Sequence, residues 1–328
     1  MRRSLYTLIV VCISIFGTGC KVENEQVIRN PENWSILLGD GTKKKGVANF
    51  VREGFFFSRT ESKTTWMSFK APNGGTTSRT SNNTRSELGE SHKWTPKQGG
   101  ELDATLKVMY VSKSGNAAVP ASYSVVVGQI HSVDGHENEP LKIFYKKFPG
   151  HEYGSVFWNY EINTEGDNSN RWDYSIPIWG YDMSITSDSL GNLPPDPLDG
   201  IRLGEAFSYK VLVEEGIMTL IFTSKGHETK RFSKSLITSS YGSLEAVPAQ
   251  VIDLYSPLGR SGYEKATGYL NEKQIFKVGC YNQSNGKSPT TNSVWHTGSN
   301  TENGNISKQY KRGDYAEVWF SNIDVKHK

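Results

Sequence analysis

The stretch Ala121-Ser-Tyr-Ser-Val-Val-Val-Gly-Gln-Ile-His131 has the composition and length of a β-strand. Successive side chains of a strand point to opposite faces, so we expect one face to carry Tyr123, Val125, Val127, Gln129 and His131. The other face would carry Val126, Gly128 and Ile130. Gln129 and His131 are therefore predicted to point in the same direction.

Short runs of the same kind recur along the chain, separated by turn residues. Examples are residues 102–111, 142–148, 155–162 and 315–325. Residues 207–213 and 217–223 flank Glu214-Glu215-Gly216 and are predicted to form a hairpin. Helical periodicity is scarce, so the sequence predicts an all-β protein, a β-jelly roll of two antiparallel sheets. Three longer stretches are predicted to be loops: residues 132–140, 163–200 and 284–305.

Composition limits the protein class. Of the 328 residues, 36% are apolar and 12% aromatic, which is enough to bury a core and excludes a disordered chain. The 37 Lys and Arg residues nearly balance the 34 Asp and Glu residues, so no overall positive field favours nucleic acid. We expect no nucleic-acid partner, and an anionic ligand would need local clusters of positive charge.

The first 20 residues have the parts of a secretory signal. Arg2 and Arg3 precede an apolar run that is too short to span a bilayer, and Gly17-Thr18-Gly19-Cys20 follows. A cysteine directly after small residues resembles a bacterial lipobox, in which Cys20 is lipidated and becomes the mature N-terminus. An ordinary signal peptide with a chance cysteine is the alternative. We expect a signal peptide at residues 1–19, a polar tether at residues 20–33 and a single domain at residues 34–328.

The cysteines leave the mature chain without a disulfide. Cys12 lies in the signal segment and Cys20 would carry lipid, so only Cys280 remains. The fold must then rest on its core, and we expect a monomer. A lipid on Cys20 would anchor the protein to the membrane, and we expect this to be the bacterial outer membrane. The charged residues that follow resemble signals that export lipoproteins to the cell surface.

Two further segments are predicted to aim polar side chains at one face of a strand. In residues 275–283, alternation gives Phe276, Val278 and Cys280 a core face and leaves Lys277, Gly279, Tyr281 and Gln283 on the other. In residues 82–90, Arg85 and Glu87 share a face. Taken singly, such residues are more often packed rings, satisfied hydrogen bonds or surface ion pairs than parts of a site.

Taken together, the three segments resemble family 7 of the polysaccharide lyases, the alginate lyases. The family signatures are Arg-Ser/Thr-Glu-Leu/Val-Arg, Gln-Ile/Val-His and Tyr-Phe-Lys-Ala-Gly-x-Tyr-x-Gln. They occur here in the same order as residues 85–89, 129–131 and 275–283. The chain departs from the pattern at Gly89, which replaces an arginine, and at Ile275 and Val278. The resemblance implies a concanavalin-like sandwich with a concave substrate groove, in which one carboxylate contact is missing or supplied elsewhere.

The resemblance also implies a β-elimination on alginate, a 1,4-linked polymer of mannuronate and guluronate. Removing the C5 proton builds negative charge on the adjacent carboxylate, which Arg85 and Gln129 would stabilise. Neutral His131 would accept the proton and Tyr281 would protonate the leaving C4 oxygen. Where proton and leaving group lie on the same side, as in mannuronate, Tyr281 would do both. The flanking sugars would be bound by Glu87, Lys277, Asn282 and Gln283. The scheme needs no cofactor and no metal.

Three alternatives remain. A jelly roll without activity would be a carbohydrate-binding module, although a convergent His131 and Tyr281 favour an enzyme. Glu161-Ile-Asn-Thr-Glu165 resembles a strand of concanavalin-like glycoside hydrolases, but Asn163 stands where that motif has Asp. A lyase acting on another polyuronate, such as a glucuronate-containing polymer, is the third, and Gly89 keeps it open.

The long loops bear on where a polymer would be cut. Residues 163–200 include Pro194-Pro195-Asp196-Pro197 and exceed what a compact jelly roll needs. Bordering the concave sheet, they would close one end of the groove and make the enzyme exolytic. Lying on the far side of the sandwich, they would leave the groove open.

Two smaller polar clusters are predicted to be solvated turns. Residues 131–139 hold His131, Asp134, His136, Glu137 and Glu139 without the regular spacing of metal ligands. Lys43-Lys44-Lys45 is the other cluster, and it would also help to attract an anionic polymer.

Overall fold

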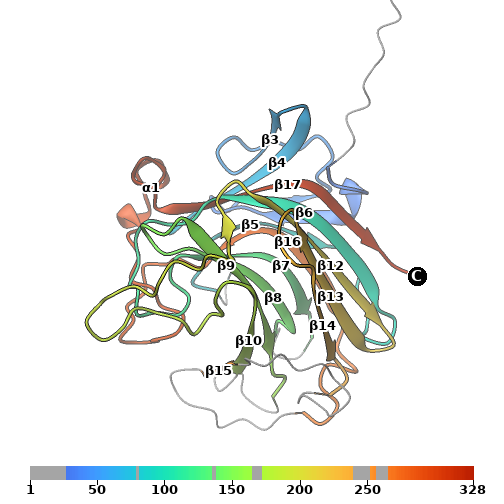
Figure 1. The fold of residues 1–328 in the computed structure, drawn as a ribbon. Helices are drawn as coiled ribbons and strands as arrows, with labels where there is room; N and C mark the ends of the chain where they lie inside the picture. The colour runs from blue at the N-terminus through green and yellow to red at the C-terminus, as the bar shows by residue number, and fades with distance from the viewer. Residues whose placement is uncertain (1–26, 79–80, 135–137, 165–171, 239–251, 256–264) are drawn as a thin grey trace, which may run out of the picture.

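The structure is a computed structural model that describes residues 27–78, 81–134, 138–164, 172–238, 252–255 and 265–328. It is a sandwich of two antiparallel sheets (Figure 1). The ten-stranded sheet has the order β15-β10-β9-β8-β7-β16-β5-β1-β2, with β11 paired to β9. The seven-stranded sheet has the order β14-β13-β12-β6-β17-β4-β3. The predicted all-β jelly roll is confirmed.

The strands of the ten-stranded sheet are β1 (Trp34–Leu37), β2 (Lys43–Lys45), β5 (Arg85–Glu90), β7 (Ser124–Ser132), β8 (Leu141–Lys146), β9 (Tyr153–Glu161), β10 (Trp172–Trp179), β11 (Ile201–Arg202), β15 (Ile252–Tyr255) and β16 (Gln274–Asn282). Those of the other sheet are β3 (Phe56–Glu61), β4 (Thr64–Pro72), β6 (Gly100–Tyr110), β12 (Ala206–Glu214), β13 (Ile217–Ser224), β14 (Lys230–Ser235) and β17 (Tyr315–Lys326). Helices are short: η1 (Pro31–Asn33), η3 (Glu302–Gly304) and α1 (Ile306–Arg312). Within the described residues, no helix is long and apolar enough to cross a membrane.

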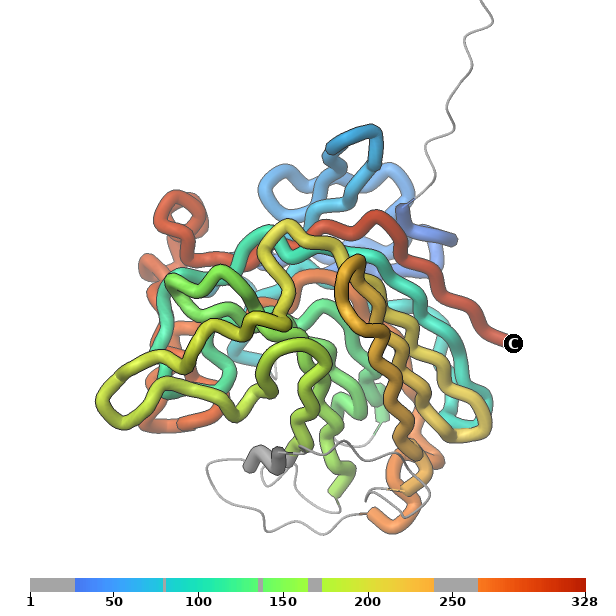
Figure 2. The backbone as a smooth tube through the Cα atoms, viewed as in Figure 1, coloured from blue at the N-terminus to red at the C-terminus, as the bar shows by residue number. Residues whose placement is uncertain are grey.

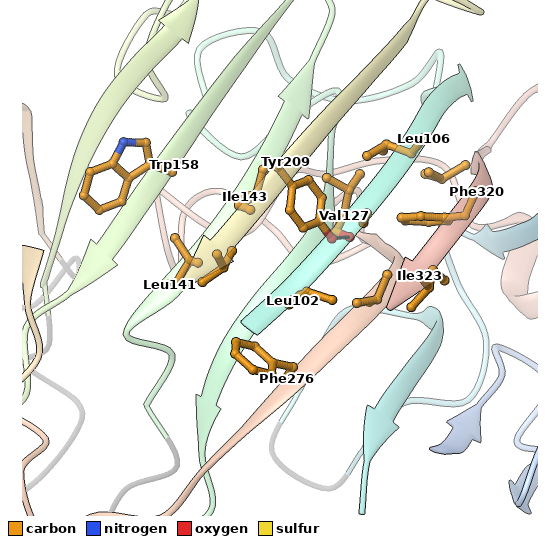
Figure 3. Close-up of a cluster of buried hydrophobic side chains, with 14 of the residues drawn as sticks. Leu102, Leu106, Val127, Leu141, Ile143, Trp158, Tyr209, Phe276, Phe320 and Ile323 are labelled. Carbon is orange, nitrogen blue, oxygen red and sulfur yellow. Dashed lines mark hydrogen bonds between the residues drawn. The ribbon is translucent and has the colours of Figure 1, made fainter. Parts of the chain in front are cut away.

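The core lies between the two sheets (Figure 3). Leu102 and Leu106 of β6 belong to the same buried cluster as Trp158 of β9 and Phe276 of β16, and all four are fully buried. Cys280 is a free, buried thiol in this core, and burial raises its pKa. Strands β1, β5, β7, β8, β9, β10 and β16 of the ten-stranded sheet therefore anchor one face in the core and leave the other available for a site.

A β-bulge interrupts the alternation predicted for β7. Val125 and Val127 face the core, and so does Ile130, although the last two lie three residues apart. The pairing with β8 shifts between Val126 and Gly128, where one extra residue moves the following side chains to the opposite face. The prediction that Val125 and Val127 share a face with Gln129 and His131 is therefore wrong.

Tyr209 of β12 explains why the bulge sits at this point. Its hydroxyl donates a hydrogen bond of 3.0 Å to the carbonyl of Val127. A Cβ atom at Gly128 would lie only 2.4 Å from the same hydroxyl oxygen, so the ring occupies the space of a side chain. The glycine lets the tyrosine reach the bulged backbone.

The folded domain begins before residue 34. Val27 and Ile28 are buried, and the backbone of Ile323 in β17 bonds to Val27 and Arg29 at 2.8 and 2.9 Å. The predicted tether at residues 20–33 is therefore wrong for residues 27–33, which pack against the sandwich. Cys20 and the predicted signal peptide lie outside the described residues.

Residues 163–200 are not a single loop as predicted. They contain β10, which pairs with β9 and turns Ile176 and Ile178 into the core. Pro177 weakened the strand signal in the sequence, because proline cannot donate to a ladder. It is tolerated here beside an irregularity in the pairing between Pro177 and Trp179.

Candidate active site

The three sequence motifs meet on the face of the ten-stranded sheet that is turned away from the other sheet, which we call the outer face. β7, β16 and β5 are neighbours there. Gln129 pairs with Lys277, Lys277 pairs with Gly89, and Tyr281 pairs with Arg85. Because direct partners in an antiparallel ladder point to the same face, segments far apart in the sequence present their polar side chains together.

Two cavities adjoin on this face. The larger, about 570 Å³, is lined in part by Arg85, Glu87, His131, Lys277 and Tyr281. The smaller, about 140 Å³, is lined by Gln283, Trp295 and His296, among others. Ser81, Glu139 and Tyr281 border both cavities. Of the predicted catalytic residues, Tyr281 therefore lies where the two cavities meet, Arg85 and His131 line the larger one, and Gln129 lines neither.

Glu87 holds Arg85 and Gln129 in place. Its Oε2 accepts a bond from Arg85 Nη1 at 3.0 Å, and its Oε1 accepts one from Gln129 Nε2. Arg85 Nε is buried with no hydrogen-bond partner among the described residues. Burial opposes the charge of Arg85, but Tyr281 and Glu87 outweigh it and raise the pKa of Arg85. The site therefore holds a buried, permanently charged guanidinium with an unused donor.

His131 is held as a neutral imidazole. Its Nδ1 lies 2.5 Å from the carbonyl oxygen of Ser132, which only accepts, so Nδ1 carries the proton. Nε2 is then the basic nitrogen, and it faces Glu139 Oε1 at 3.5 Å. Burial, assisted by the charge of Lys277, lowers the pKa of His131 to about 4. At neutral pH the ring is ready to accept a proton.

Tyr281 places a phenol beside the guanidinium. The Cζ of Arg85 lies 3.7 Å from the centre of the tyrosine ring, and the tyrosine hydroxyl lies 2.9 Å from Ser81 Oγ. The hydroxyl thus stands at the junction of the two cavities with a hydrogen-bonding partner. This is the position of a group that gives a proton to an atom bound across both cavities.

Of the four residues predicted to bind flanking sugars, one is not on the outer face. Asn282 is fully buried, and its side-chain amide donates to the carbonyl of Ala71 and to Asn73 Oδ1 at 3.2 and 3.0 Å. Alternation places it with Cys280, so its assignment to the substrate site is wrong. Glu87 and Lys277 line the larger cavity, and Gln283 lines the smaller one, where its Oε1 accepts a bond from Asn83.

Glu139 belongs to the site, although the sequence placed it in a solvated turn. Ser132 N donates to Asn138 O at 2.8 Å, so the chain after β7 doubles back toward His131. Glu139 Oε2 also lies 3.6 Å from Lys142 Nζ. The hairpin between β7 and β8 was the signal that could have predicted this contact. His136 and Glu137 of the same cluster lie outside the described residues.

The outer face is open on one side and covered on the other. A row of register partners crosses it from β2 to β10: Lys45, Ser35, Gly89, Lys277, Gln129, Lys142, Asn159 and Ser175. The first four are exposed or half-buried. Gln129 and Lys142 are 1% and 4% exposed, and Asn159 and Ser175 are fully buried. Along this row, the cover thus begins at Gln129 of β7, the strand that also carries the predicted base.

Residues 180–185, which we call the end wall, form part of the cover. Met183 N donates to Ser175 Oγ at 3.0 Å, and Asn159 Nδ2 lies 3.3 Å from Met183 Sδ. Lys146 Nζ holds the end wall through the carbonyl of Ile185 at 2.8 Å. Met183 packs on the outer-face side chains Val126, Phe144 and Phe157.

A second segment reinforces the end wall. Figure 2 shows the yellow-green chain after β10 and the orange-red chain after β16 at the same end of the molecule. Both form backbone hydrogen bonds with the segment before β7. Ser187 N donates to Ala117 O at 2.9 Å, and Ala121 N donates to Val294 O at 3.1 Å. Trp295 packs against the same apolar cluster as Met183.

The glycoside-hydrolase alternative finds no support in this arrangement. Glu161 is fully buried and lies 3.0 Å from Lys142 Nζ in an ion pair. Glu165, its predicted partner, lies outside the described residues. A carboxylate held this way is not free to serve as a general acid for a bound sugar.

Comparison with known proteins agrees with the motifs and the fold. The family model described as alginate lyase matches residues 30–327. An alginate lyase of Klebsiella pneumoniae is 30% identical over 277 residues, which cover 74% of this chain and 76% of that protein. A crystal structure of an alginate lyase from the same organism has a TM-score of 0.62 at 22% identity, covering 91% of this chain and 96% of that one.

A second solved structure is much more similar. The crystal structure of the exolytic PL7 alginate lyase AlyA5 from Zobellia galactanivorans is 54% identical, with a TM-score of 0.86. The match covers 92% of this chain and 96% of that one. With the motifs on one face, the shared jelly roll and these matches, the chain belongs to polysaccharide lyase family 7 and is an alginate lyase.

Proposed function

We propose that this alginate lyase acts exolytically, cleaving alginate by β-elimination close to one end of the chain. The observation that carries the proposal is the position of the catalytic groups. Arg85, His131 and Tyr281 line the open cavity at the point where the cover of the outer face begins. A polymer entering from β2 meets the end wall soon after it passes these groups. The similarity to AlyA5, which is described as exolytic, supports the proposal.

The cleavage begins with charge neutralisation. The carboxylate of the uronate at the junction of the cavities accepts hydrogen bonds from Arg85 and Gln129. As the C5 proton leaves, negative charge grows on this carboxylate. Donors already held by Glu87 stabilise that charge without having to reorient.

The proton transfers follow from the groups at the junction. His131 Nε2 takes the C5 proton, a C4–C5 double bond forms, and the C4–O bond breaks. Tyr281 gives its proton to the leaving oxygen, which becomes a hydroxyl group of the departing sugar. Glu139, 3.5 Å from His131 Nε2, stabilises the imidazolium that forms. Exchange with solvent restores both groups.

The viscosity of the polymer during digestion tests whether cleavage is exolytic. We expect ultraviolet absorbance from the new double bond to rise steadily on polymannuronate or polyguluronate while viscosity falls slowly, since each exolytic event leaves a long chain. The two signals are compared at equal extents of cleavage. An early collapse of viscosity with a ladder of oligomers would show internal cutting and overturn the proposal.

The low pKa of His131 predicts an unusual acid limb in the pH profile. A protonated imidazole cannot accept the C5 proton, so kcat/KM should fall only as the pH drops through about 4. If His131 kept the ordinary pKa of a histidine, the enzyme would lose half its activity near pH 6.5. Initial rates on a short oligosaccharide at constant ionic strength measure the limb. Half-loss close to pH 6.5 would contradict the burial of His131 in the working enzyme.

We further propose that Cys20 carries a lipid that anchors the enzyme to the outer membrane, with the catalytic domain facing the cell exterior. The support is the signal-like run and the small residues before Cys20. The native protein should partition with membranes, and Cys20→Ser should release it or block its processing. An unmodified N-terminus downstream of Cys20 would refute the anchor. Protease treatment of intact cells tests the outward orientation.

A further inference from the structure

The edge strand β2 presents two lysines to the substrate side of the sheet. Lys45 pairs with Ser35, and Lys43 pairs with Leu37, and these two β1 residues pair in turn with Gly89 and Glu87. Partners in the ladder share a face, so Lys43 and Lys45 lie on the outer face with the catalytic groups. Both lysines are exposed and border the larger cavity.

Lys44 alternates to the other side of the same strand, although on this edge strand it also borders the larger cavity. Its ladder partner is Ile36, which is 3% exposed and belongs to the core. Lysines on an edge strand commonly serve to prevent pairing with another chain, and Lys44 serves that purpose as well as its neighbours do. The role of Lys43 and Lys45 must therefore be compared with that of an exposed lysine outside both cavities.

Gly89 leaves open space between the lysines and the catalytic groups. A Cβ at this position would meet nothing closer than Ile275 Cδ1 and Lys277 Cγ, both at 3.9 Å. The strand order from β16 through β5 and β1 to β2 puts Lys45 three strand spacings from Lys277, about 14 Å. The cavity floor between these cations is thus wide enough for a sugar, and it offers no cation of its own.

Lys43 and Lys45 are also unneutralised. Among the described residues, neither lies in an ion pair or a side-chain hydrogen bond, whereas Lys107 and Lys210 of the other sheet are paired with carboxylates. Binding an anion at β2 therefore breaks no existing pair. Two free ammonium groups on one face suit the repeated carboxylates of a polyuronate.

We propose that Lys43 and Lys45 form a carboxylate-binding subsite, which holds a uronate unit remote from the cleaved bond above the space left by Gly89. The subsite lies on the side from which the chain enters, so it retains the part of the polymer that remains after each cut. This inference rests on the proposed entry of alginate across β2. It assigns β2 a function in substrate length preference and not in the chemical step.

Kinetics on size-defined alginate oligosaccharides, from trisaccharide to hexasaccharide, test the subsite. In the Lys43→Gln/Lys45→Gln variant we expect KM to rise about threefold to tenfold for the longest substrates, because two partly exposed ion pairs are lost. The shortest cleaved substrate does not reach β2, so its KM should stay unchanged, as should kcat throughout. High salt should reduce the difference from the wild type.

Two further variants sharpen the test. Lys225→Gln removes the same charge from an exposed lysine in the turn after β13, outside the lining of both cavities, and should leave every KM unchanged. Gly89→Arg in the double variant places a cation in the open space and should lower KM for long substrates again. An unchanged KM in the double variant, an equal rise in Lys225→Gln, or no recovery with Gly89→Arg would each overturn the subsite. If the wild type cuts internally while the length-dependent effect persists, the exolytic proposal fails and the subsite stands.

Discussion

Replacing Tyr281 with phenylalanine is expected to lower kcat on alginate by about 10²–10⁴-fold, the usual contribution of a general acid. The variant keeps the ring beneath the Arg85 guanidinium, 3.7 Å from its centre, and keeps the packing against the apolar cluster around Met183. It loses only the hydroxyl that bonds to Ser81. The leaving C4 oxygen then departs without a proton. Initial rates of ultraviolet absorbance increase measure the loss.

Tyr153→Phe is the matched control for this substitution. Tyr153 also has an arginine over its ring, Arg202 at 4.1 Å, but it lies on β9 away from the lining of both cavities. Its variant should retain wild-type kcat. Near-normal turnover in a folded Tyr281→Phe protein would mean that another group protonates the leaving oxygen.

Replacing His131 with alanine is expected to lower kcat on polyguluronate by about 10²–10⁴-fold, because the C5 proton loses its acceptor. In mannuronate the proton and the leaving oxygen lie on the same side of the ring, so Tyr281 is placed to serve both transfers. We therefore expect a smaller loss on polymannuronate. The two substrates are compared at saturation with the same enzyme preparation.

His92→Ala is the control for the loss of an imidazole. His92 is exposed, and its ring centre lies 4.2 Å from that of His327, outside both cavities. Its variant should retain activity on both block types. Equal, small losses on the two polymers in His131→Ala would exclude His131 as the base.

The sequence predicted the fold and most of the site because these depend on local patterns. Alternation in residues 275–283 placed Phe276 in the core and Lys277 on the outer face, and the structure agrees. Alternation would also have excluded Asn282 from the substrate site, because it points to the same face of β16 as the core residue Cys280. That residue was assigned from its place in the motif, and in the structure its buried side chain bonds to the backbone of Ala71 and Ser284 and to the side chain of Asn73.

Features that depend on contacts between distant segments were not predictable. The bulge in β7 requires Tyr209 from the other sheet, 82 residues away along the chain, and no local pattern around Val127 reveals it. The end wall likewise depends on Met183 meeting Asn159 and Ser175 across the outer face. The sequence indicated that long loops could close the groove, but only the register of the strands shows which half is covered.

The most direct test of the account is the first product formed from an alginate hexasaccharide labelled at its reducing end. An exolytic enzyme yields one labelled species at the start: either a chain shortened by a single short product, or the label released in that short product. The end wall over Asn159 of β9 and Ser175 of β10 predicts one of these two results, with a C4–C5 double bond in the unsaturated fragment. Several labelled fragments of intermediate length in the earliest samples would contradict it.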